Sequence, residues 1–323
     1  MELSGRTAAV VGAGTIGVSW ATLFAAHGMR VRVTDPREDA GQVVSDAVRQ
    51  FAATLPGGPR EPDELLELVE VTGLEQAVAG ADVVQENGPE RIDLKRSLFA
   101  DIERAAPPHA LLLSSTSGLM PTDMGADMRE PGRLLVGHPF NPPHVVPLVE
   151  VVPGEHTSPD QAQAAADFYR SLGKVPVVLR KEIGGFVANR LQSALFQESV
   201  HLVLSGVVTP EELDQVVTES VGVRWATAGP FESYSLGGGP GGIRHLLEHL
   251  GPGMARRWKD LGRPELTPEV VDRLSTATEE RFAGRSYEER VTARDEAQLA
   301  VLDARQRVRG GSGDEPAPGT SPP

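Results

Sequence analysis

The sequence predicts an α/β fold: a Rossmann-type, doubly wound and mostly parallel sheet, followed by an all-helical C-terminal domain. Two observations lead to this prediction. Before Gly184, short apolar segments typical of strands alternate with segments of helical pattern. After Gly185 the strand-like segments stop, and helix-start signals follow one another. We therefore expect a sheet domain over residues 1–184, a helical domain over residues 185–308, and a disordered tail rich in Gly, Pro and Ser over residues 309–323.

The N-terminal elements carry a dinucleotide-binding pattern. Thr7–Val11 is a short apolar strand, Gly12–Gly17 reads GAGTIG, and an alanine-rich helix follows that ends near Gly28. The next strand, Arg30–Asp35, ends in an acid 23 residues after Gly12. A strand, this glycine-rich turn, a helix and a later acid together form the dinucleotide-binding fingerprint. The complete context argues against the alternative, a glycine-rich turn that binds nothing.

The fingerprint also predicts the kind of cofactor. Gly12, Gly14 and Gly17 let backbone N–H groups approach a pyrophosphate at a helix N-terminus. Asp35 is expected to accept hydrogen bonds from the adenosine ribose hydroxyls, and its charge would repel a 2′-phosphate. The pattern therefore favours NAD over NADP, although the nearby Arg37 weakens the preference.

Five further segments before Gly184 are predicted as strands. Because parallel strands end at one edge of a sheet, ligands of such folds bind where the strands end. Polar clusters follow these strand ends: QENGPE at Gln85–Glu90, SSTSG at Ser114–Gly118, and His138. We expect them to share one site with the fingerprint. The predicted strands are Ala81–Gln85, Ala110–Ser115, Arg133–Gly137, Val146–Val152 and Val175–Leu179, and the main helices are Ile92–Ala105 and Ser158–Leu172.

His138 and Glu150 are the pair expected to carry chemistry. Glu150 lies within the apolar strand VPLVEVV, where an ionised carboxylate needs a partner. If the HPFNPPH segment turns back, His138 reaches Glu150, and a carboxylate on one imidazole nitrogen leaves the other nitrogen as a base. Oxidation of an alcohol requires such a base. Two alternatives stay open: a purely structural histidine–glutamate pair, and His144 as the partner of Glu150.

The second half reads as helices with clear starts. Phe186–Leu204 is long and largely apolar, which suits a buried or dimer-forming helix. Helix-start signals with proline at the first helical position occur at Thr209-Pro210 and Thr267-Pro268, and a capping box occurs at Ser286–Glu289. The glycine-rich run Leu236–Gly242 is expected to be a loop.

Composition limits the classes of function. Asp and Glu number 45 and Lys and Arg 31, so the net charge is −14, which argues against nucleic-acid and membrane-surface binding. The chain has no cysteine, which excludes disulfides, thiolate catalysis and Cys-based metal sites, and we expect no metal site. It shows neither a signal-peptide layout nor an apolar run of about 20 residues. We expect a soluble, cytoplasmic protein.

These motifs together resemble the 3-hydroxyacyl-CoA dehydrogenase superfamily. The matching segments are GAGTIG, SSTSGL, GHPFNPP with LVEVV, and KEIGGFVANRL, which cover most of the chain in the expected order. The resemblance implies that His138 is the catalytic base with Glu150 as its partner, and that the second domain forms a homodimer. It further implies that Ser117 and Asn189 hydrogen-bond the substrate oxygen or the histidine, and that Asn141 holds the loop or the substrate carbonyl. The implied cofactor contacts are Thr15, Ile16, Asp35, Glu90 and Lys95.

Within the superfamily, the chain resembles a branch that acts on free hydroxy acids and includes lambda-crystallin, an L-gulonate 3-dehydrogenase, and L-carnitine dehydrogenase. QENGPE followed by DLKRSLF is similar to the former, and VGVRWATAGPF with LGGGPGGIRH to the latter. The Glu38–Glu70 segment is short and has no lysine to grip a CoA tail, and the G-x-G-F-Y signature of acyl-CoA enzymes is absent. Arg224 stands where those enzymes have an apolar residue, and it suits a free carboxylate. The alternative for Arg224 is a salt bridge with Glu219 or Glu232.

The sequence therefore predicts an NAD-dependent oxidoreductase that converts the 3-hydroxyl of a free L-3-hydroxy acid, L-gulonate- or carnitine-like, to a 3-oxo acid. Ser117, Asn141 and Arg224 are the expected substrate contacts. One alternative is an L-3-hydroxyacyl-CoA or carrier-bound 3-hydroxyacyl dehydrogenase. A second alternative is a non-catalytic NAD-binding protein. The only expected partners are a small-molecule substrate and a second copy of the chain.

Overall fold

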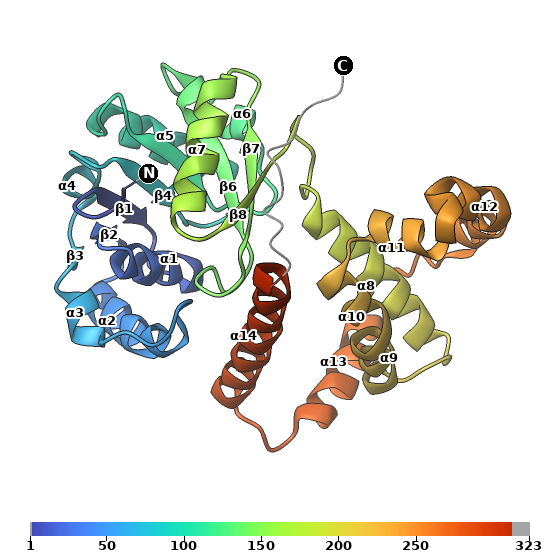
Figure 1. Cartoon of the computed structure of the whole chain (residues 1–323). Helices are drawn as coiled ribbons and strands as arrows, with labels where there is room; N and C mark the ends of the chain where they lie inside the picture. Colours follow the sequence, from blue (N-terminus) through green and yellow to red (C-terminus); the bar gives the residue numbers. More distant parts are fainter. Residues whose placement is uncertain (1, 312–323) are drawn as a thin grey trace. The chain divides into compact units, whose positions relative to one another are not determined.

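A computed structural model describes residues 2–311 of the chain, with side chains through residue 308. The chain separates into two compact units, Met1–Arg190 and Leu191–Pro323. Figure 1 labels the elements of both units. In the part of the chain that is described, no helix is long and apolar enough to cross a membrane.

The first unit is built on a sheet of eight strands within the described residues, in the order β3-β2-β1-β4-β5-β6-β7-β8. Neighbouring strands are parallel except β6 and β7, which are antiparallel. The predicted doubly wound and mostly parallel sheet is therefore confirmed. The strands are β1 (Thr7–Val11), β2 (Arg30–Thr34), β3 (Val69–Val71), β4 (Val83–Glu86), β5 (Leu111–Ser114), β6 (Leu134–Pro139), β7 (Leu148–Pro153) and β8 (Val175–Val178).

Helices cover both faces of this sheet. Alternate strand residues point to opposite faces, so Ala8 and Val10 of β1 join one core, and Ala9 and Val11 join the other. The first core is closed by α1 (Thr15–Ala26), α2 (Ala40–Phe51), α3 (Pro62–Leu66) and α7 (Pro159–Ser171). The second core is closed by α4 (Leu74–Val78), α5 (Ile92–Ala105) and α6 (Pro121–Met124). Because both faces are buried at the centre of the sheet, central strands such as β1 and β5 are nearly continuous apolar runs.

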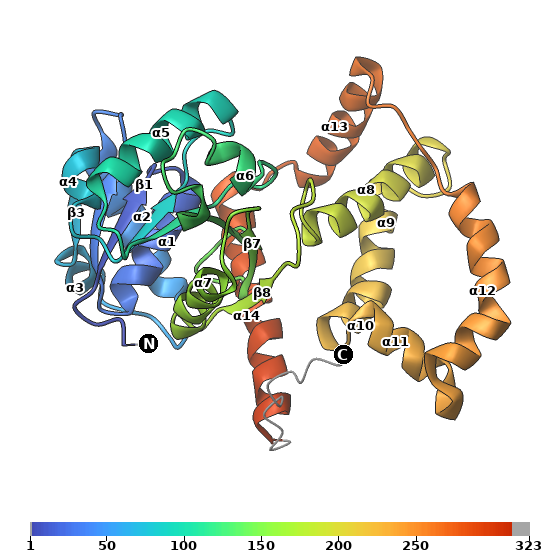
Figure 2. The same cartoon turned by 90° about the horizontal axis from the view of Figure 1, so that it is seen from above.

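The second unit is helical. It contains the main part of α8 (Ala188–Leu204), then α9 (Pro210–Val216), a π-helical turn (Val217–Val221), α10 (Gly222–Thr227), α11 (Pro230–Gly237), α12 (Gly242–Asp260), α13 (Pro268–Phe282) and α14 (Tyr287–Gly311). Figure 2 shows α8 to α12 following one another along the chain. Thr209 and Thr267 cap α9 and α13 through their side chains, as the sequence predicts.

Four details differ from the sequence predictions. The short strand β3 was not predicted, because three half-exposed residues give too weak a pattern. The long helix starts at Ala188, because Phe186 adopts a left-handed backbone with φ of 49°. The expected Leu236–Gly242 loop is the end of α11, a 3₁₀ turn and the start of α12. Of the expected tail 309–323, residues 309–311 continue α14, and residues 312–323 lie outside the described residues.

Candidate active site

The polar clusters lie at one end of the strands, where β1, β4, β5 and β6 finish and the antiparallel β7 begins. β1, β4, β5 and β6 are parallel, so Gly12, Asn87, Ser115 and His138 all lie at their carboxyl ends. β7 runs the opposite way, and its register places Glu150 directly opposite His138. The HPFNPPH segment therefore turns back between β6 and β7.

The glycine-rich turn packs tightly against the turn that follows β4. Gly12 has φ of 99°, and a Cβ there would lie 2.9 Å from the Asn87 carbonyl oxygen. A Cβ on Gly17 would lie 1.9 Å from the Gly12 carbonyl oxygen. A Cβ on Gly14 would have no atom within 4 Å, and Gly14, the N-cap of α1, makes no side-chain capping bond. The first turn of α1, with Thr15 and Ile16, therefore presents free backbone N–H groups, the arrangement that binds a phosphate.

Asp35 holds the same turn from the side of β2. Its Oδ2 accepts a hydrogen bond from the Ala13 N–H at 2.7 Å, and its Oδ1 accepts one from the Arg37 N–H at 3.0 Å. The Arg37 guanidinium lies 3.5 Å from Asp35 Oδ1 and 3.8 Å from Asp39 Oδ1. Arg37 is thus shared between two acids. In the described part of the chain, no group of three or more His, Cys, Asp or Glu side chains is arranged to hold a metal ion.

His138 and Glu150 form a buried pair. His138 Nδ1 lies 2.9 Å from Glu150 Oε2, and the two side chains are 6% and 3% exposed. The imidazole packs against Phe140 and Phe186, whose ring centroids are 4.8 and 5.3 Å away. No hydrogen bond to His138 Nε2 occurs within the described part of the chain. The contact expected from the sequence is therefore present, with one ring nitrogen still available.

The start of α8 holds the other oxygen of Glu150. Glu150 Oε1 accepts hydrogen bonds from the N–H groups of Val187 and Ala188, at 2.9 and 3.0 Å. Burial raises the pKa of Glu150, but the bonds from His138, Ala188 and Val187 and the charge of His138 together bring that pKa below its usual value. Glu150 therefore stays ionised beside the imidazole.

Ser117 and Asn189 meet next to this pair. Asn189 follows Ala188 in α8, and its side-chain amide donates to the Ser117 carbonyl oxygen at 3.2 Å. Glu90 binds the loop that contains Ser117, since its Oε1 accepts hydrogen bonds from the Ser117 N–H at 2.9 Å and from the Gly118 N–H at 3.1 Å. A continuous set of contacts thus runs from His138 through Glu150 and the start of α8 to Ser117 and Glu90.

Lys95, one of the cofactor contacts that the resemblance implies, is buried. Its ammonium is 1% exposed and donates to both carboxylate oxygens of Glu86, each at 2.7 Å, and to the Gly88 carbonyl oxygen at 3.1 Å. Glu86 is itself fully buried. Glu86 was not predicted as a site residue, although an acid within a buried strand is the same signal that identified Glu150.

The structure decides the position of His144. Its ring nitrogens contact the hydroxyls of Ser19 and Thr54, at 2.8 and 3.0 Å, and its ring stacks on Phe51. Because antiparallel pairing aligns Glu150 with His138, the alternative of a His144–Glu150 pair is wrong. His144 instead fixes the loop that carries Asn141 to α1 and to the end of α2.

The positions of two predicted substrate residues, Asn141 and Arg224, do not by themselves locate a substrate. Asn141 is exposed, and a cis peptide bond joins it to Pro142. Arg224 lies in α10 of the second unit, exposed, and among the described residues no ion pair includes its guanidinium. The predicted alternative, a salt bridge from Arg224 to Glu219 or Glu232, is therefore not formed.

A buried polar network supports the site edge and was not predicted. Gln85 receives the hydroxyl of Tyr169 at 2.7 Å and donates to Ser115 at 2.9 Å. Ser115 also receives the indole N–H of Trp20 at 3.2 Å and donates to Asn87 at 2.7 Å. These residues come from α1, β4, α7 and the turns after β4 and β5, which are far apart in the sequence, so no local pattern predicts the network.

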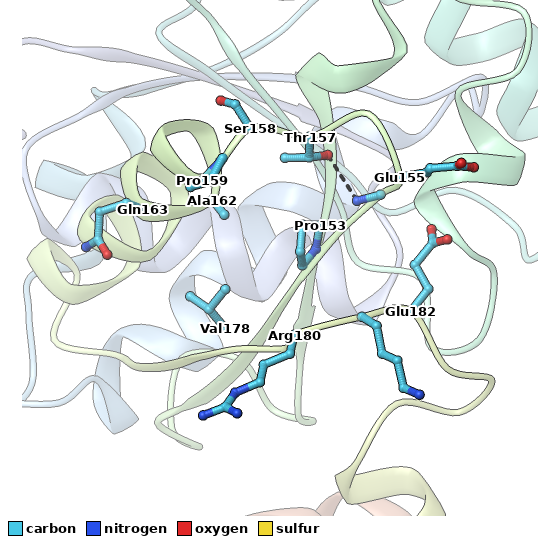
Figure 3. A pocket seen from close by; sticks show the side chains of 12 residues that line it. Pro153, Glu155, Thr157, Ser158, Pro159, Ala162, Gln163, Val178, Arg180 and Glu182 are labelled. Atoms are coloured by element: carbon cyan, nitrogen blue, oxygen red, sulfur yellow. Dashed lines mark hydrogen bonds between the residues drawn. The ribbon is translucent and has the colours of Figure 1, made fainter. Parts of the chain in front are cut away.

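A separate hollow of about 680 Å³ lies at the opposite end of the strands from His138 (Figure 3). It is lined by residues at the ends of β7 and β8 and at the start of α7, among them Pro153, Val178 and Ser158. Pro153 pairs with Leu135 near the start of β6, whereas His138 lies near the end of that strand. This hollow is therefore not part of the site around His138.

The fold and this site define an NAD-dependent oxidoreductase that acts on CH–OH groups. Residues 7–183 match the NAD-binding domain model of 3-hydroxyacyl-CoA dehydrogenase, and residues 185–283 match the C-terminal domain model of the same family. The chain belongs to the 3-hydroxyacyl-CoA dehydrogenase family, which confirms the resemblance seen in the sequence.

Several relatives cover nearly the whole chain. An L-carnitine dehydrogenase of Nocardiopsis dassonvillei is 43% identical over 304 residues, which is 94% of this chain and 92% of that protein. An L-carnitine dehydrogenase of Streptomyces coelicolor is 43% identical and covers 94% of this chain and 96% of that protein. Among solved structures, 5-formyl-3-hydroxy-2-methylpyridine 4-carboxylic acid 5-dehydrogenase aligns with a TM-score of 0.76 at 30% identity, over 95% of this chain and 99% of that one.

Proposed function

We propose that this chain oxidises the 3-hydroxyl of a free L-3-hydroxy acid to a 3-oxo acid with NAD, and that L-carnitine or a close analogue is the substrate. The observation that carries the proposal is His138, which is bonded through Nδ1 to Glu150 while Nε2 has no partner among the described residues. The relatives named L-carnitine dehydrogenase, 43% identical over nearly the whole chain, support this choice of substrate over L-gulonate.

His138 and Glu150 supply the acid–base part of the reaction. With its Nδ1–H donated to Glu150, the imidazole keeps Nε2 as the acceptor, which takes the proton of the substrate hydroxyl. The charge of Glu150 stabilises the imidazolium that forms. When bound, the nicotinamide would accept the hydride that leaves the substrate carbon bearing this hydroxyl. We assign Ser117 and Asn189 to the orientation of the substrate oxygen, and Asn141 to the loop or to the substrate carbonyl.

The glycine-rich turn and Asp35 favour NAD over NADP. The close approach of Gly12 and Gly17 to neighbouring backbone leaves the start of α1 open for a pyrophosphate. A 2′-phosphate needs a free cation beside the ribose, but Arg37 already lies between Asp35 and Asp39. Glu90, at the same edge, is a further candidate cofactor contact.

The segment after Asp35 supports a free acid over a CoA thioester. The CoA tail carries several phosphates, which require cations. Between Glu38 and Glu70 the basic residues are Arg49 and Arg60, and Arg49 is paired with Asp63 at 2.7 Å. Arg224, which has no acid partner in the described part of the chain, is our candidate for the substrate carboxylate.

The second unit is proposed to form a homodimer. Its helices expose many large apolar side chains, and Phe231 and Leu236 are 80% and 71% exposed. A soluble monomer rarely exposes so many. Sedimentation velocity of the full chain at micromolar concentration is expected to give twice the mass of one 34.4 kDa chain. A monomer that is fully active would contradict this part of the proposal.

The test of function is nicotinamide reduction on a small substrate panel. L-carnitine, D-carnitine, L-gulonate, free L-3-hydroxybutyrate and its CoA thioester are each assayed with NAD and with NADP. We expect turnover of L-carnitine, with NAD preferred. Turnover of the thioester alone would support the acyl-CoA alternative, and binding of NAD without turnover of any alcohol would support a non-catalytic protein.

A further inference from the structure

We propose that Lys174 is a positioning residue of the active site. It holds the loop between β6 and β7, residues 140–147, and thereby fixes the position of Asn141. His144 and Ser19 hold the same loop from another element, and the three residues are here called the loop clamp. The inference rests on the proposed function for the role of Asn141. It concerns how that residue is held, which is a separate question from which alcohol the enzyme oxidises.

The β6–β7 loop has few backbone donors of its own. Pro142, Pro143 and Pro147 have no N–H group, so the loop contains more carbonyl acceptors than backbone donors. The N–H groups of Val145 and Val146 both donate to the Pro142 carbonyl oxygen, each at 3.0 Å, and close a tight turn. The other carbonyl groups of this turn need donors from elsewhere, because a buried carbonyl without a partner is costly.

Lys174 supplies these donors. It directly precedes β8, and it is only 6% exposed, although lysine is rarely buried without a partner. Its Nζ donates to the carbonyl oxygens of Pro143 and Val146, to the latter at 3.0 Å. Burial lowers the pKa of Lys174 to about 7, and no carboxylate offsets this effect. The buried lysine is therefore bonded to the turn rather than to an acid.

His144 and Ser19 tie the same turn to the dinucleotide helix α1. The Ser19 hydroxyl contacts His144 twice, since it accepts from the backbone N–H at 2.9 Å and lies 2.8 Å from the ring Nδ1. The other ring nitrogen lies 3.0 Å from the Thr54 hydroxyl, and the ring stacks on Phe51. Both ring nitrogens of His144 thus face hydroxyls of neighbouring elements, which holds the side chain in one orientation.

The clamp therefore holds the turn from two directions. Lys174 reaches it from the start of β8, where Val175 pairs with Leu148 at the start of β7. Ser19 reaches it from α1, the helix that begins at the glycine-rich turn. The two sides also touch each other, because Lys174 Nζ lies 5.8 Å from the centroid of the Trp20 ring in α1. The middle of the loop is thus fixed to the sheet and to the dinucleotide helix together.

The turn that is held in this way lies next to the catalytic pair. Phe140, the first residue of the loop, packs on the His138 ring with 4.8 Å between the ring centroids. Asn141 follows Phe140 and directly precedes the turn. His138 and Glu150 are kept opposite each other by strand pairing, which does not depend on the turn. Loss of the clamp is therefore expected to displace Asn141 while the base and the dinucleotide site stay in place.

The first test is hydrogen–deuterium exchange on Lys174→Met, followed by peptides that cover residues 140–148. We expect the Val145 and Val146 amides to exchange at least about tenfold faster than in the wild type, because their turn loses its side-chain donor. A peptide that covers β1 should keep its wild-type rate, which separates local loosening from a loss of global stability. Lys181→Met, which changes an exposed lysine, is the matched control. Unchanged exchange at Val145 and Val146 would overturn the proposal.

The second test is kinetic and uses L-carnitine, or the alcohol of the substrate panel that is turned over best. We expect Lys174→Met to lower kcat/KM at least about tenfold, while the Kd for NAD stays within about threefold. In an Asn141→Ala background the same change should lower kcat/KM less than about threefold, because the residue that the clamp positions is already gone. Equal losses in the two backgrounds would mean that Lys174 acts on stability or through another residue, and would overturn the proposal.

Failure of the proposed function would give a different result. A chain that turns over no alcohol of the panel would contradict that function, and the exchange experiment would still decide whether Lys174 holds the loop. If Lys174→Met does not fold, Ser19→Ala takes its place, because it removes the contacts of the hydroxyl with His144. Faster exchange of the His144 amide, with a loss of kcat/KM that disappears in the Asn141→Ala background, would then support the loop clamp. Wild-type exchange of that amide would overturn it.

Discussion

Whether an imidazole serves as a base depends on which of its nitrogens is already occupied. In His138 the occupied nitrogen is Nδ1, which faces Glu150, and the ring is held by Phe140 and Phe186. Glu150 has its second oxygen bonded to the start of α8, so it can neither rotate away nor lose its charge easily. Nε2 therefore has no partner in the described part of the chain, which is what the proposed role as general base requires.

The first prediction concerns His138→Ala. We expect kcat to fall by roughly 10²–10⁴-fold, the usual contribution of a general base, while the Kd for NAD stays within about threefold. His109→Ala is the matched control, because His109 is an exposed histidine whose nearest acid, Asp82, lies 4.0 Å away. Steady-state rates with L-carnitine and calorimetry with NAD measure the two quantities. An unchanged kcat would remove His138 from the mechanism.

The second prediction concerns the buried Lys174. Burial lowers the pKa of Lys174 from 10.5 to about 7, and its ammonium donates to the carbonyl oxygens of Pro143 and Val146 rather than to an acid. Between pH 7 and 10.5 the unfolded state binds this proton and the folded state does not, so the free energy of unfolding rises with pH. The contribution is fully present above pH 10.5 and is lost as the pH falls to 7.

Urea unfolding at pH 7, 8 and 9 measures this effect. We expect the wild type to gain up to about 1.4 kcal/mol per pH unit from Lys174 relative to Lys174→Met. Lys181→Met, which changes an exposed lysine, should run parallel to the wild type. Parallel curves for Lys174→Met and the wild type would show that the buried lysine keeps its ordinary pKa.

At the scale of elements, the space around each glycine indicates whether that glycine is needed for packing of the turn or for binding of the dinucleotide. Gly17 has no room for a Cβ, whereas Gly14 has open space around it. The third prediction is therefore that Gly17→Ala lowers the free energy of unfolding by about 1–3 kcal/mol and abolishes NAD binding. Gly14→Ala should unfold like the wild type, yet raise the Kd for NAD at least about tenfold, because its Cβ meets the pyrophosphate. A loss of stability in Gly14→Ala would contradict this division of roles.

Local pattern predicted most elements but not the contacts between distant ones. The strand, glycine turn and helix at Thr7–Ala26 were recognisable because each signal lies within a few residues. From the sequence, the contact between Glu150 and His138 could be predicted only on the condition that the HPFNPPH segment turns back. The register that brings the two residues opposite each other depends on pairing between strands. The Lys95–Glu86 pair was missed because an ion pair that is nine residues apart in sequence has no distinct local pattern.

At the scale of the whole molecule, our proposal assigns cofactor binding to the first unit and recognition of the substrate carboxylate to the second. The first unit contains the dinucleotide turn and the His138–Glu150 pair, and its fold alone is compatible with many alcohols. The second unit contributes Arg224, which follows a π-helical turn, a feature often found at functional sites. We therefore propose that the choice between substrates of one family depends on residues of the helical unit.

The fourth prediction tests that dependence. A guanidinium that binds a substrate carboxylate through two parallel hydrogen bonds contributes about 1.5–3 kcal/mol, so Arg224→Ala should raise the KM for L-carnitine by roughly one to two decades with a smaller change in kcat. Arg224→Lys should recover only part of the loss, because an ammonium lacks the planar pair of donors. Arg256→Ala, which removes another exposed arginine of the same unit, is the control and should keep the wild-type KM. A wild-type KM in Arg224→Ala would mean that the carboxylate is bound elsewhere, and the free-acid preference would then rest on the short acidic segment after Asp35 and on the missing G-x-G-F-Y signature.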